Sequence, residues 1–317
     1  MEQAINFDIE QFFHSSDFEN IKKNVSLNIV DHTYKPKISD PKSDWVSSVA
    51  VPAFQYIFKE KGIQDNFASL GTGAGLDALA ACQILHSKRL VVTDLHEDVV
   101  KLATSNIQNN LQNNAIEVIG KAGDLTYPLE DLGIKYDLIY ENLPNIPLLN
   151  DINLLDSQNS STFIADRIEK IPDSITKSLL SLHYLAVKNS QQLLNPEGDI
   201  ISVIGGRIPL SEILTIPQLC HSHGEIILMT WKIQSEATDV INGYLEWEKN
   251  DYMKFHFYPV EKLQEVFTDQ SYITGQDEAI KMETALKPYE LSSEEALRLT
   301  NKGVPVGHTV VVLKCHY

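Results

Sequence analysis

Three glycines and an aspartate are the residues of this chain whose types and spacing best fit ligand binding. Gly71, Gly73 and Gly75 follow the apolar run 67–70, and Asp94 ends the next apolar run, 23 residues after Gly71. Glycine lets a backbone turn tightly and approach a ligand that side chains would hold away. In nucleotide-binding α/β units, a carboxylate at the end of the second strand accepts hydrogen bonds from ribose hydroxyls. The spacing therefore predicts a site for a ligand that contains a nucleoside.

Each of these features has a plainer interpretation when it stands alone. Glycine turns also serve only to pack a helix close to a strand, and acids at strand ends are often solvated turn residues. A dinucleotide fingerprint places its third glycine three positions after the second, whereas here that position is Leu76 and Gly75 comes one residue early. The Gly-x-Gly-x-Gly spacing resembles the loop of class I S-adenosylmethionine-dependent methyltransferases. The resemblance implies that Gly71, Gly73 and Gly75 hold the methionine and ribose part of S-adenosylmethionine, and that Asp94 holds its ribose hydroxyls.

A second group of candidates follows the apolar run 136–140. Asn142, Leu143, Pro144 and Asn145 resemble the Asn-Pro-Pro-Tyr motif of methyltransferases that act on planar or amide nitrogens, such as release-factor glutamine methyltransferases. The resemblance implies catalytic roles: the Asn142 side-chain oxygen and the Leu143 carbonyl would each accept an N–H from the acceptor nitrogen, while Pro144 stiffens the turn. The family has an aromatic residue at the position of Asn145, so a smaller aliphatic or guanidino substrate is expected. The alternative is a turn that merely ends a strand.

Three further residues are weaker candidates. In related methyltransferases the position of Asp124 contacts the adenine amino group, although an exposed turn aspartate is the alternative. Arg207 follows the strand candidate 199–204, where it would bind a substrate carboxylate with two hydrogen bonds or cap backbone carbonyls. Tyr184 lies on the helix before that strand, where it would either line the substrate site or pack in the core.

Apolar runs alternate with helix-like segments along most of the chain, which predicts an α/β fold with a mainly parallel sheet. The helix expected from Leu76 carries Asp77 in its first turn, where an acid complements the helix dipole. Class I methyltransferases have a doubly wound, Rossmann-like sheet of seven strands with an antiparallel last strand, and the late runs agree with this. The strand candidates are residues 67–70, 90–93, 116–119, 136–140, 199–204, 225–231 and 308–314.

The same pattern suggests a division of the chain. Residues 1–62 are expected to form a mostly helical N-terminal cap, and residues 63–317 the methyltransferase domain. Two segments are longer than usual connections, 146–178 and 234–305. Such insertions serve as lids or substrate walls, or as surface elaborations.

The amino-acid composition of the chain limits the kinds of partner that it is expected to bind. The chain has 43 acidic and 26 basic residues, a net charge of -17 and a pI of about 4.9. Nucleic-acid binding depends on neutralised phosphates, so DNA and RNA are disfavoured. We find no apolar run long enough to span a membrane, no signal-like start and no metal-ligand spacing. Cys82, Cys220 and Cys315 form no disulfide pattern and are expected to be buried, in a cytoplasmic protein. Whether the chain forms a homodimer stays open.

The expected function is methyl transfer from S-adenosylmethionine to nitrogen of a small amino compound or an amino-acid side chain. An alternative keeps the cofactor: some proteins that resemble methyltransferases cyclise S-adenosylmethionine and release methylthioadenosine, as azetidine-2-carboxylate synthases do. Two other classes remain, namely a degenerate domain that only binds a partner, and a nicotinamide dehydrogenase. Product analysis and cofactor binding distinguish these alternatives.

Overall fold

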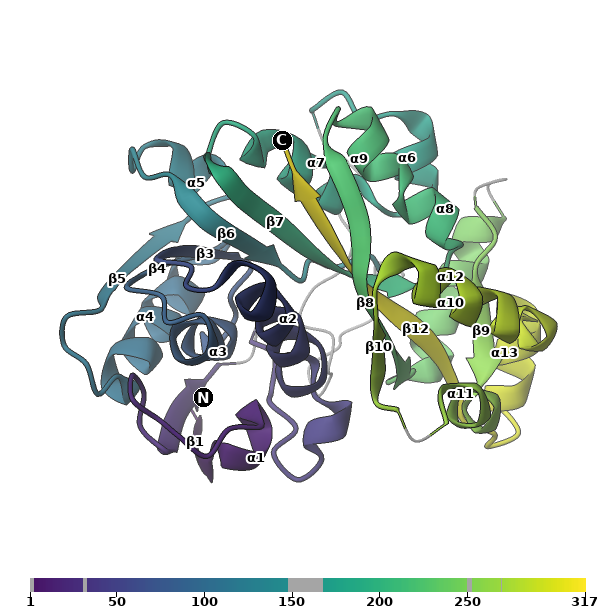
Figure 1. The fold of residues 1–317 in the computed structure, drawn as a ribbon. Coiled ribbons are helices and arrows are strands. Elements are labelled where there is room, and N and C mark those ends of the chain that lie inside the picture. The colour runs from purple at the N-terminus through teal and green to yellow at the C-terminus, as the bar shows by residue number, and fades with distance from the viewer. Residues whose placement is uncertain (1–2, 31–32, 148–167, 250–252, 269) are drawn as a thin grey trace. The chain divides into compact units, whose positions relative to one another are not determined.

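The computed structural model describes residues 3–30, 33–147, 168–249, 253–268 and 270–317 (Figure 1). The chain divides into two compact units, neither of which is continuous in sequence. The first unit contains residues 1–142, 186–202 and 315–317, and the second contains residues 143–185 and 203–314. Residues 1–62, expected as a cap of their own, thus fall in the first unit together with the glycine turn.

The first unit is built on parallel strands. Their order is β7-β6-β3-β4-β5, and each neighbouring pair is parallel. Helices α2, α3 and α4 lie on one face of these strands, and α3 packs against both α2 and α4 (Figure 1). Because β3, β4 and β6 are almost wholly buried, they are rich in apolar residues. The elements are β3 (Asn66–Leu70), α3 (Leu76–Ile84), β4 (Arg89–Asp94), α4 (Glu97–Asn110), β5 (Glu117–Ala122), α5 (Tyr127–Glu130), β6 (Tyr136–Glu141), α2 (Val51–Lys61), and β7 (Leu194–Gly206) and α7 (Ser181–Ser190), which both run across the division.

The N-terminal region corrects the expectation of a mostly helical cap. Strands β1 (Gln3–Asp8) and β2 (Asn24–Ile29) pair antiparallel, with the short helix α1 (Glu10–Phe13) between them. Helical structure is found later, in the π-helical turn Val46–Ala50 and in α2. The reason is a period of two: along β2 the buried Val25, Leu27 and Ile29 alternate with more exposed residues, a pattern typical of a strand.

The second unit carries the late strands. Its described strands are β8 (His223–Ile233), β9 (His256–Pro259), β10 (Tyr272–Thr274), β11 (Leu291–Ser292) and β12 (Val306–His316). The Gln234 amide, just after β8, donates to the carbonyl of Val306 at the start of β12, over 2.9 Å. At the other end Lys314 Nζ lies 2.8 Å from Glu225 Oε1. The last strand is therefore antiparallel to β8, as expected.

The expected insertion 234–305 is a folded region between β8 and β12. It contains β9, β10 and β11, and the helices α10 (Ala237–Glu248), α11 (Val260–Phe267), α12 (Gln276–Leu286) and α13 (Ser293–Thr300). The other helices of this unit are α6 (Asp173–Lys177), α8 (Leu210–Ile213) and α9 (Thr215–Leu219). Of the expected insertion 146–178, residues 148–167 lie outside the described residues.

All seven predicted strand segments are strands of the structure, as β3 to β8 and β12, and the sheet has additional strands beside them. The cysteines Cys82, Cys220 and Cys315 are buried and unbonded to one another, as expected. Among the described helices none is both long and apolar enough to cross a membrane.

Candidate functional site

The glycine turn follows β3 and adopts a backbone that only glycine adopts readily. The φ angles of Gly71, Gly73 and Gly75 are 69°, 54° and 85°. The amides of Gly71 and Thr72 donate to the carbonyl of Thr93 in β4, over 2.9 and 3.0 Å. The turn is therefore fixed to the neighbouring strand at its first two residues.

Two of the glycines meet different surroundings. A Cβ atom placed on Gly75 would lie 3.0 Å from Ile107 Cγ1 and 3.1 Å from the Ala103 carbonyl oxygen, both in α4. Among the described residues, the atom that a Cβ on Gly73 would meet is the Tyr34 amide nitrogen, at 3.9 Å. Gly75 is thus the packing glycine of the plainer interpretation, whereas Gly73 keeps the space beside the turn open, as a binding residue would.

Asp77, in the first turn of α3, stabilises the glycine turn through hydrogen bonds of its side chain. Its carboxylate accepts hydrogen bonds from the Ser69 hydroxyl, from Thr72 Oγ1 at 2.9 Å and from the Ala78 amide at 2.8 Å. Burial raises its pKa to about 6, and the hydrogen bonds oppose that rise. The sequence pattern predicted only that Asp77 is an acidic residue at the start of a helix. Its hydrogen bonds with Ser69 and Thr72 depend on the conformation of the chain between β3 and α3.

Asp94 ends β4 beside the glycine turn. One carboxylate oxygen accepts from the Gly73 amide and the other from the His96 amide, each over 3.3 Å. Burial raises the pKa of Asp94, while these amides and the His96 charge oppose the rise. The Asp94 carbonyl accepts from Gly123, which directly precedes Asp124, over 2.9 Å. The carboxyl ends of β3, β4 and β5 therefore bring the glycine turn, Asp94 and the turn of the half-buried Asp124 together.

The donors and acceptors at this end fit a nucleoside. A carboxylate has about four acceptor positions, and the contacts of Asp94 with Gly73 and His96 occupy two of them. Among the described residues no lysine or arginine is paired with Asp94, so its remaining capacity suits hydroxyl groups such as those of ribose. The open space beside Gly73 would let a ligand approach the backbone of the glycine turn closely.

Buried carboxylates add negative charge near the end of β6. Tyr140 is 2% exposed, and Glu141 is fully buried. The pKa of Tyr140 is raised well above its usual value, first by burial and then by the charges of Asp77, Glu141 and Asp44. Asp44 accepts from the Tyr34 hydroxyl at 2.9 Å and holds the chain that precedes α2. This charge suits a cationic ligand; no motif around Asp44 indicated it from the sequence.

The predicted acceptor motif crosses the division of the chain. Asn142 is exposed and is the last residue of this part of the first unit, whereas Leu143 and Pro144 are half-buried in the second. Asn145 is buried: its Nδ2 donates to the Gly205 carbonyl over 3.1 Å, and its own carbonyl accepts from the Tyr244 hydroxyl over 2.9 Å. The roles of Asn142, Leu143 and Pro144 remain predictions, and within the second unit Asn145 acts as an anchor.

Arg207 is buried in the second unit and is held by neutral groups. Its Nε and Nη2 donate to Gln234 Oε1 over 3.0 and 2.7 Å, and its Nη2 lies 2.7 Å from His308 Nε2. Burial lowers the pKa of Arg207, and burial and the Arg207 charge hold that of His308 well below its usual value. His308 is therefore neutral and its Nε2 accepts. Tyr184, 5% exposed, packs with its carbonyl 3.8 Å from Cys220 Sγ. Substrate contacts of Arg207 and Tyr184 remain predictions.

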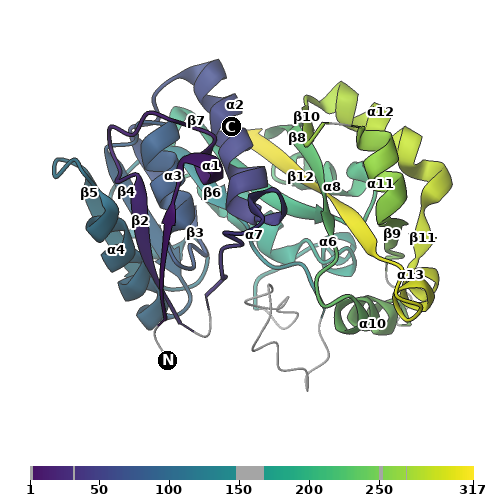
Figure 2. The same cartoon turned by 90° about the horizontal axis from the view of Figure 1, so that it is seen from below.

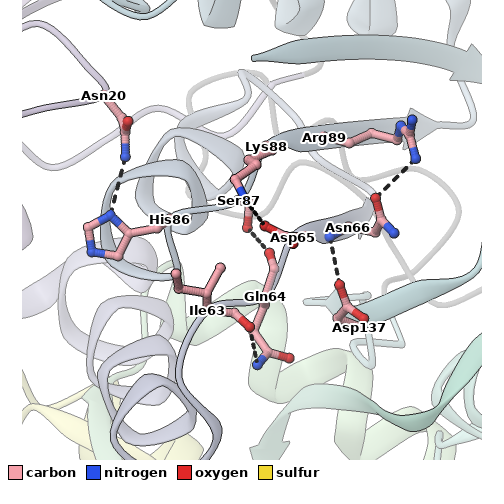
Figure 3. Close-up of polar contacts among 10 residues, drawn as sticks. All are labelled: Asn20, Ile63, Gln64, Asp65, Asn66, His86, Ser87, Lys88, Arg89 and Asp137. Carbon is pink, nitrogen blue, oxygen red and sulfur yellow. Dashed lines mark hydrogen bonds and ion pairs between the residues drawn. The ribbon is translucent and has the colours of Figure 1, made fainter. Parts of the chain in front are cut away.

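The amino ends of the same strands carry a different network, shown in Figure 3. The Asn66 amide donates to Asp137 Oδ2 over 2.8 Å, and Arg89 Nη1 donates to Asn66 Oδ1 over 3.1 Å. Ser87 Oγ donates to the Gln64 carbonyl over 2.6 Å. These groups join β3, β4 and β6 to one another at the end opposite the glycine turn.

Comparison with solved structures finds matches of low sequence identity and low TM-score. The YcgJ protein from Bacillus subtilis is 15% identical, with a TM-score of 0.42 over 83% of this chain and 97% of that one. A methyltransferase from Pyrococcus furiosus is 16% identical, with a TM-score of 0.39 over 64% and 82% of the two chains. A ribosomal protein L11 methylase from Lactobacillus delbrueckii is 17% identical, with a TM-score of 0.36 over 66% and 87%. No family model and no curated protein matches the sequence.

Proposed function

We propose that this chain is an S-adenosylmethionine-dependent methyltransferase that acts on nitrogen of a small amino compound or an amino-acid side chain. The observation that carries the proposal is the contact between the Gly73 amide and the Asp94 carboxylate beside an open glycine turn. A turn and a carboxylate held in this way at the ends of adjacent parallel strands support the binding of a nucleoside with an attached chain. The mainly parallel α/β fold supports the same conclusion.

Each part of the cofactor has a candidate partner in the first unit. The turn from Gly71 to Gly75 would hold the methionine part, Asp94 the ribose hydroxyls and Asp124 the adenine. When bound, S-adenosylmethionine supplies a methyl group activated by a positively charged sulfur. The carboxylates of Asp44, Asp77 and Glu141 would favour such a cationic ligand over a neutral or anionic nucleoside.

The chain's part in the reaction is mostly orientation. Asn142 Oδ1 and the Leu143 carbonyl would accept the N–H groups of the acceptor and direct its lone pair, and Pro144 would keep these two oxygens in place. Correct orientation lowers a barrier by several kcal/mol, up to about 7–11 kcal/mol in well-ordered systems. No strong base is required when the proton leaves after the transfer.

The test is product analysis. The purified protein is incubated with S-adenosylmethionine, with and without a small-metabolite extract, and the products are identified by liquid chromatography and mass spectrometry. S-adenosylhomocysteine that forms only with extract, together with a metabolite heavier by one methyl group, supports the proposal. Methylthioadenosine formed without extract overturns it in favour of cyclisation. If titration calorimetry also finds no binding of S-adenosylmethionine, a methyltransferase role is excluded.

A further inference from the structure

Two asparagines of α4 fasten the N-terminal strand β2 to the first unit, and Figure 2 shows β2 alongside α4. Asn106 Oδ1 accepts from the Asn28 amide over 2.8 Å, and its Nδ2 donates to the Asn28 carbonyl over 2.9 Å. Asn110 makes the same pair with Ser26, over 2.9 and 2.7 Å. Both asparagines are 1% exposed.

The spacing explains why this arrangement works. Residues four apart in a helix lie on one face about 6 Å apart along the axis. Alternate residues of a strand are separated by about 6.7 Å and point their backbone groups the same way. Asn106 and Asn110 therefore offer two amides in step with Asn28 and Ser26, so that α4 pairs with the edge of β2 as another strand would.

The two asparagines differ in one contact. Asn106 Nδ2 also donates to the carbonyl of Ala74 over 2.9 Å. Asn110 Nδ2 instead donates to the carbonyl of Asn106 in its own helix, over 2.7 Å. Ala74 stands between Gly73 and Gly75, so Asn106 bridges β2 and the glycine turn, and both of its N–H donors and its oxygen are in use.

A second segment of the N-terminal region lies near the same turn. The amide nitrogen of Tyr34, which follows β2, lies 3.9 Å from the position that a Cβ on Gly73 would take. The N-terminal region therefore borders the turn on the side where Gly73 is open, while Asn106 holds Ala74 from α4.

We propose that Asn106 is a positioning residue that couples the docking of β1–β2 to the shape of the glycine turn. When β2 is docked, Asn28 fixes the Asn106 amide and the amide fixes Ala74. A ligand that requires this shape of the turn then stabilises the docked strand pair, and docking strengthens ligand binding by the same factor. Only the identity of the ligand, S-adenosylmethionine, rests on the proposed function.

The experiment compares Asn106→Ala with Asn110→Ala, its matched control. Each variant removes the amide that pairs with one residue of β2, but only the first removes the contact with Ala74. Titration calorimetry with S-adenosylmethionine should show an affinity at least tenfold lower for Asn106→Ala. Asn110→Ala, which weakens the docking of β2 but keeps the contact with Ala74, should show a clearly smaller loss. Equal losses in the two variants, or none in either, overturn the proposal.

Hydrogen exchange of the ligand-free protein tests the coupling independently of the ligand's identity. The amides of Gly71, Thr72 and Gly75 are bonded within the turn or to β4, so their exchange reports its order. Exchange there should rise at least fivefold in Asn106→Ala and stay unchanged in Asn110→Ala. If Asn106→Ala fails to fold, Asn106→Asp takes its place: it keeps the acceptor for the Asn28 amide but lacks the N–H groups for the Asn28 and Ala74 carbonyls. Exchange in the turn should then rise at least fivefold in the Asp variant. Unchanged exchange in the Asp variant contradicts the proposal.

The two proposals fail differently. If the wild-type protein does not bind S-adenosylmethionine, the proposed function fails, while the exchange comparison still decides whether Asn106 orders the turn. If it binds but the ligand slows exchange in β1 equally in the wild type and in Asn106→Ala, the proposed function stands and the coupling fails.

Discussion

The two ends of the parallel strands in the first unit differ in what their polar side chains bind. At the amino ends, Asp137 pairs with the Asn66 amide and with Asn195 Nδ2, and Arg89 pairs with Glu117 at 2.5 Å. At the carboxyl ends, the hydrogen bonds that Asp94 accepts from described residues come from the backbone amides of Gly73 and His96. Asp137 thus accepts from a side-chain amide as well as from the backbone, whereas Asp94, among the described residues, accepts from the backbone. The kind of partner, more than the residue type, distinguishes these two aspartates.

The glycine turn supplies the largest expected effect. In Gly75→Ala the methyl group would lie about 3.0–3.1 Å from atoms of α4, on a backbone with φ of 85°. Left-handed strain and overpacking together should lower the free energy of unfolding by about 2–5 kcal/mol. Chemical denaturation measures this. Gly73→Ala should cost less stability because, in the described part of the chain, its methyl would meet no atom closer than 3.9 Å. Equal losses of stability in the two variants would remove the distinction between the two glycines.

The pH dependence of stability tests the buried acid beneath the turn. The folded-state pKa of Asp77 is raised to about 6, above an unfolded value of about 3.9. A raised carboxyl pKa destabilises the folded protein only when the group is ionised. The cost is therefore absent below about pH 4 and complete above about pH 6, where it amounts to roughly 2–3 kcal/mol.

The measurement is the unfolding free energy of the wild type relative to Asp77→Asn between pH 4 and pH 7. The wild type should lose stability relative to the variant as the pH rises. A difference that stays constant over this range would show that the two states bind the Asp77 proton equally.

Asp94 and Asp137 compare the two ends directly. Asp94→Ala should weaken S-adenosylmethionine binding by about 1.5–3 kcal/mol, because a hydrogen bond to a charged group is lost. Asp137→Ala removes the partners of Asn66 and Asn195, so it should lower stability and leave affinity unchanged. Titration calorimetry and thermal unfolding of both variants check this. Loss of affinity in Asp137→Ala with unchanged affinity in Asp94→Ala would show that the ligand binds at the amino ends of the strands.

The smallest effect is expected at an exposed ion pair of the amino end. Lys88 Nζ lies 2.9 Å from Asp65 Oδ1, with 71% and 51% of the two side chains exposed. Lys88→Ala should change stability by less than about 1 kcal/mol, and less still at high salt. Chemical denaturation at two salt concentrations measures this change. A larger loss of stability would mean that the network at the amino ends depends on its exposed ion pair.

The sequence predicted the strands β3 to β8 and β12 of this fold better than it predicted the N-terminal strands β1 and β2. The strands β3 to β8 and β12 follow from long apolar runs with turn residues between them, and Asp94 follows from its place after β4. The short strands β1 and β2, of six residues each, lie within residues 1–62, which were expected to be mostly helical. The structure stabilises β2 through side chains about eighty residues further along the chain, Asn106 and Asn110, which no local pattern near β2 indicates.

For the candidate site, the sequence indicates the residues that form a local pattern, and their binding roles stay predictions. The glycines and Asp94 form a local pattern, and the structure brings them together. The contributions of Asp44 and Asn106 come from contacts between distant segments, for which the sequence carries no local signal. The packing role of Gly75 likewise depends on α4, which lies beyond the turn in sequence.

The division of the chain has a consequence for how such a protein is inherited. The backbone passes between the two units four times, after Asn142, Leu185, Ser202 and Lys314. A single genetic crossover therefore cannot exchange one unit for a counterpart from another gene without cutting both. The two units are therefore expected to descend together, as one inherited unit.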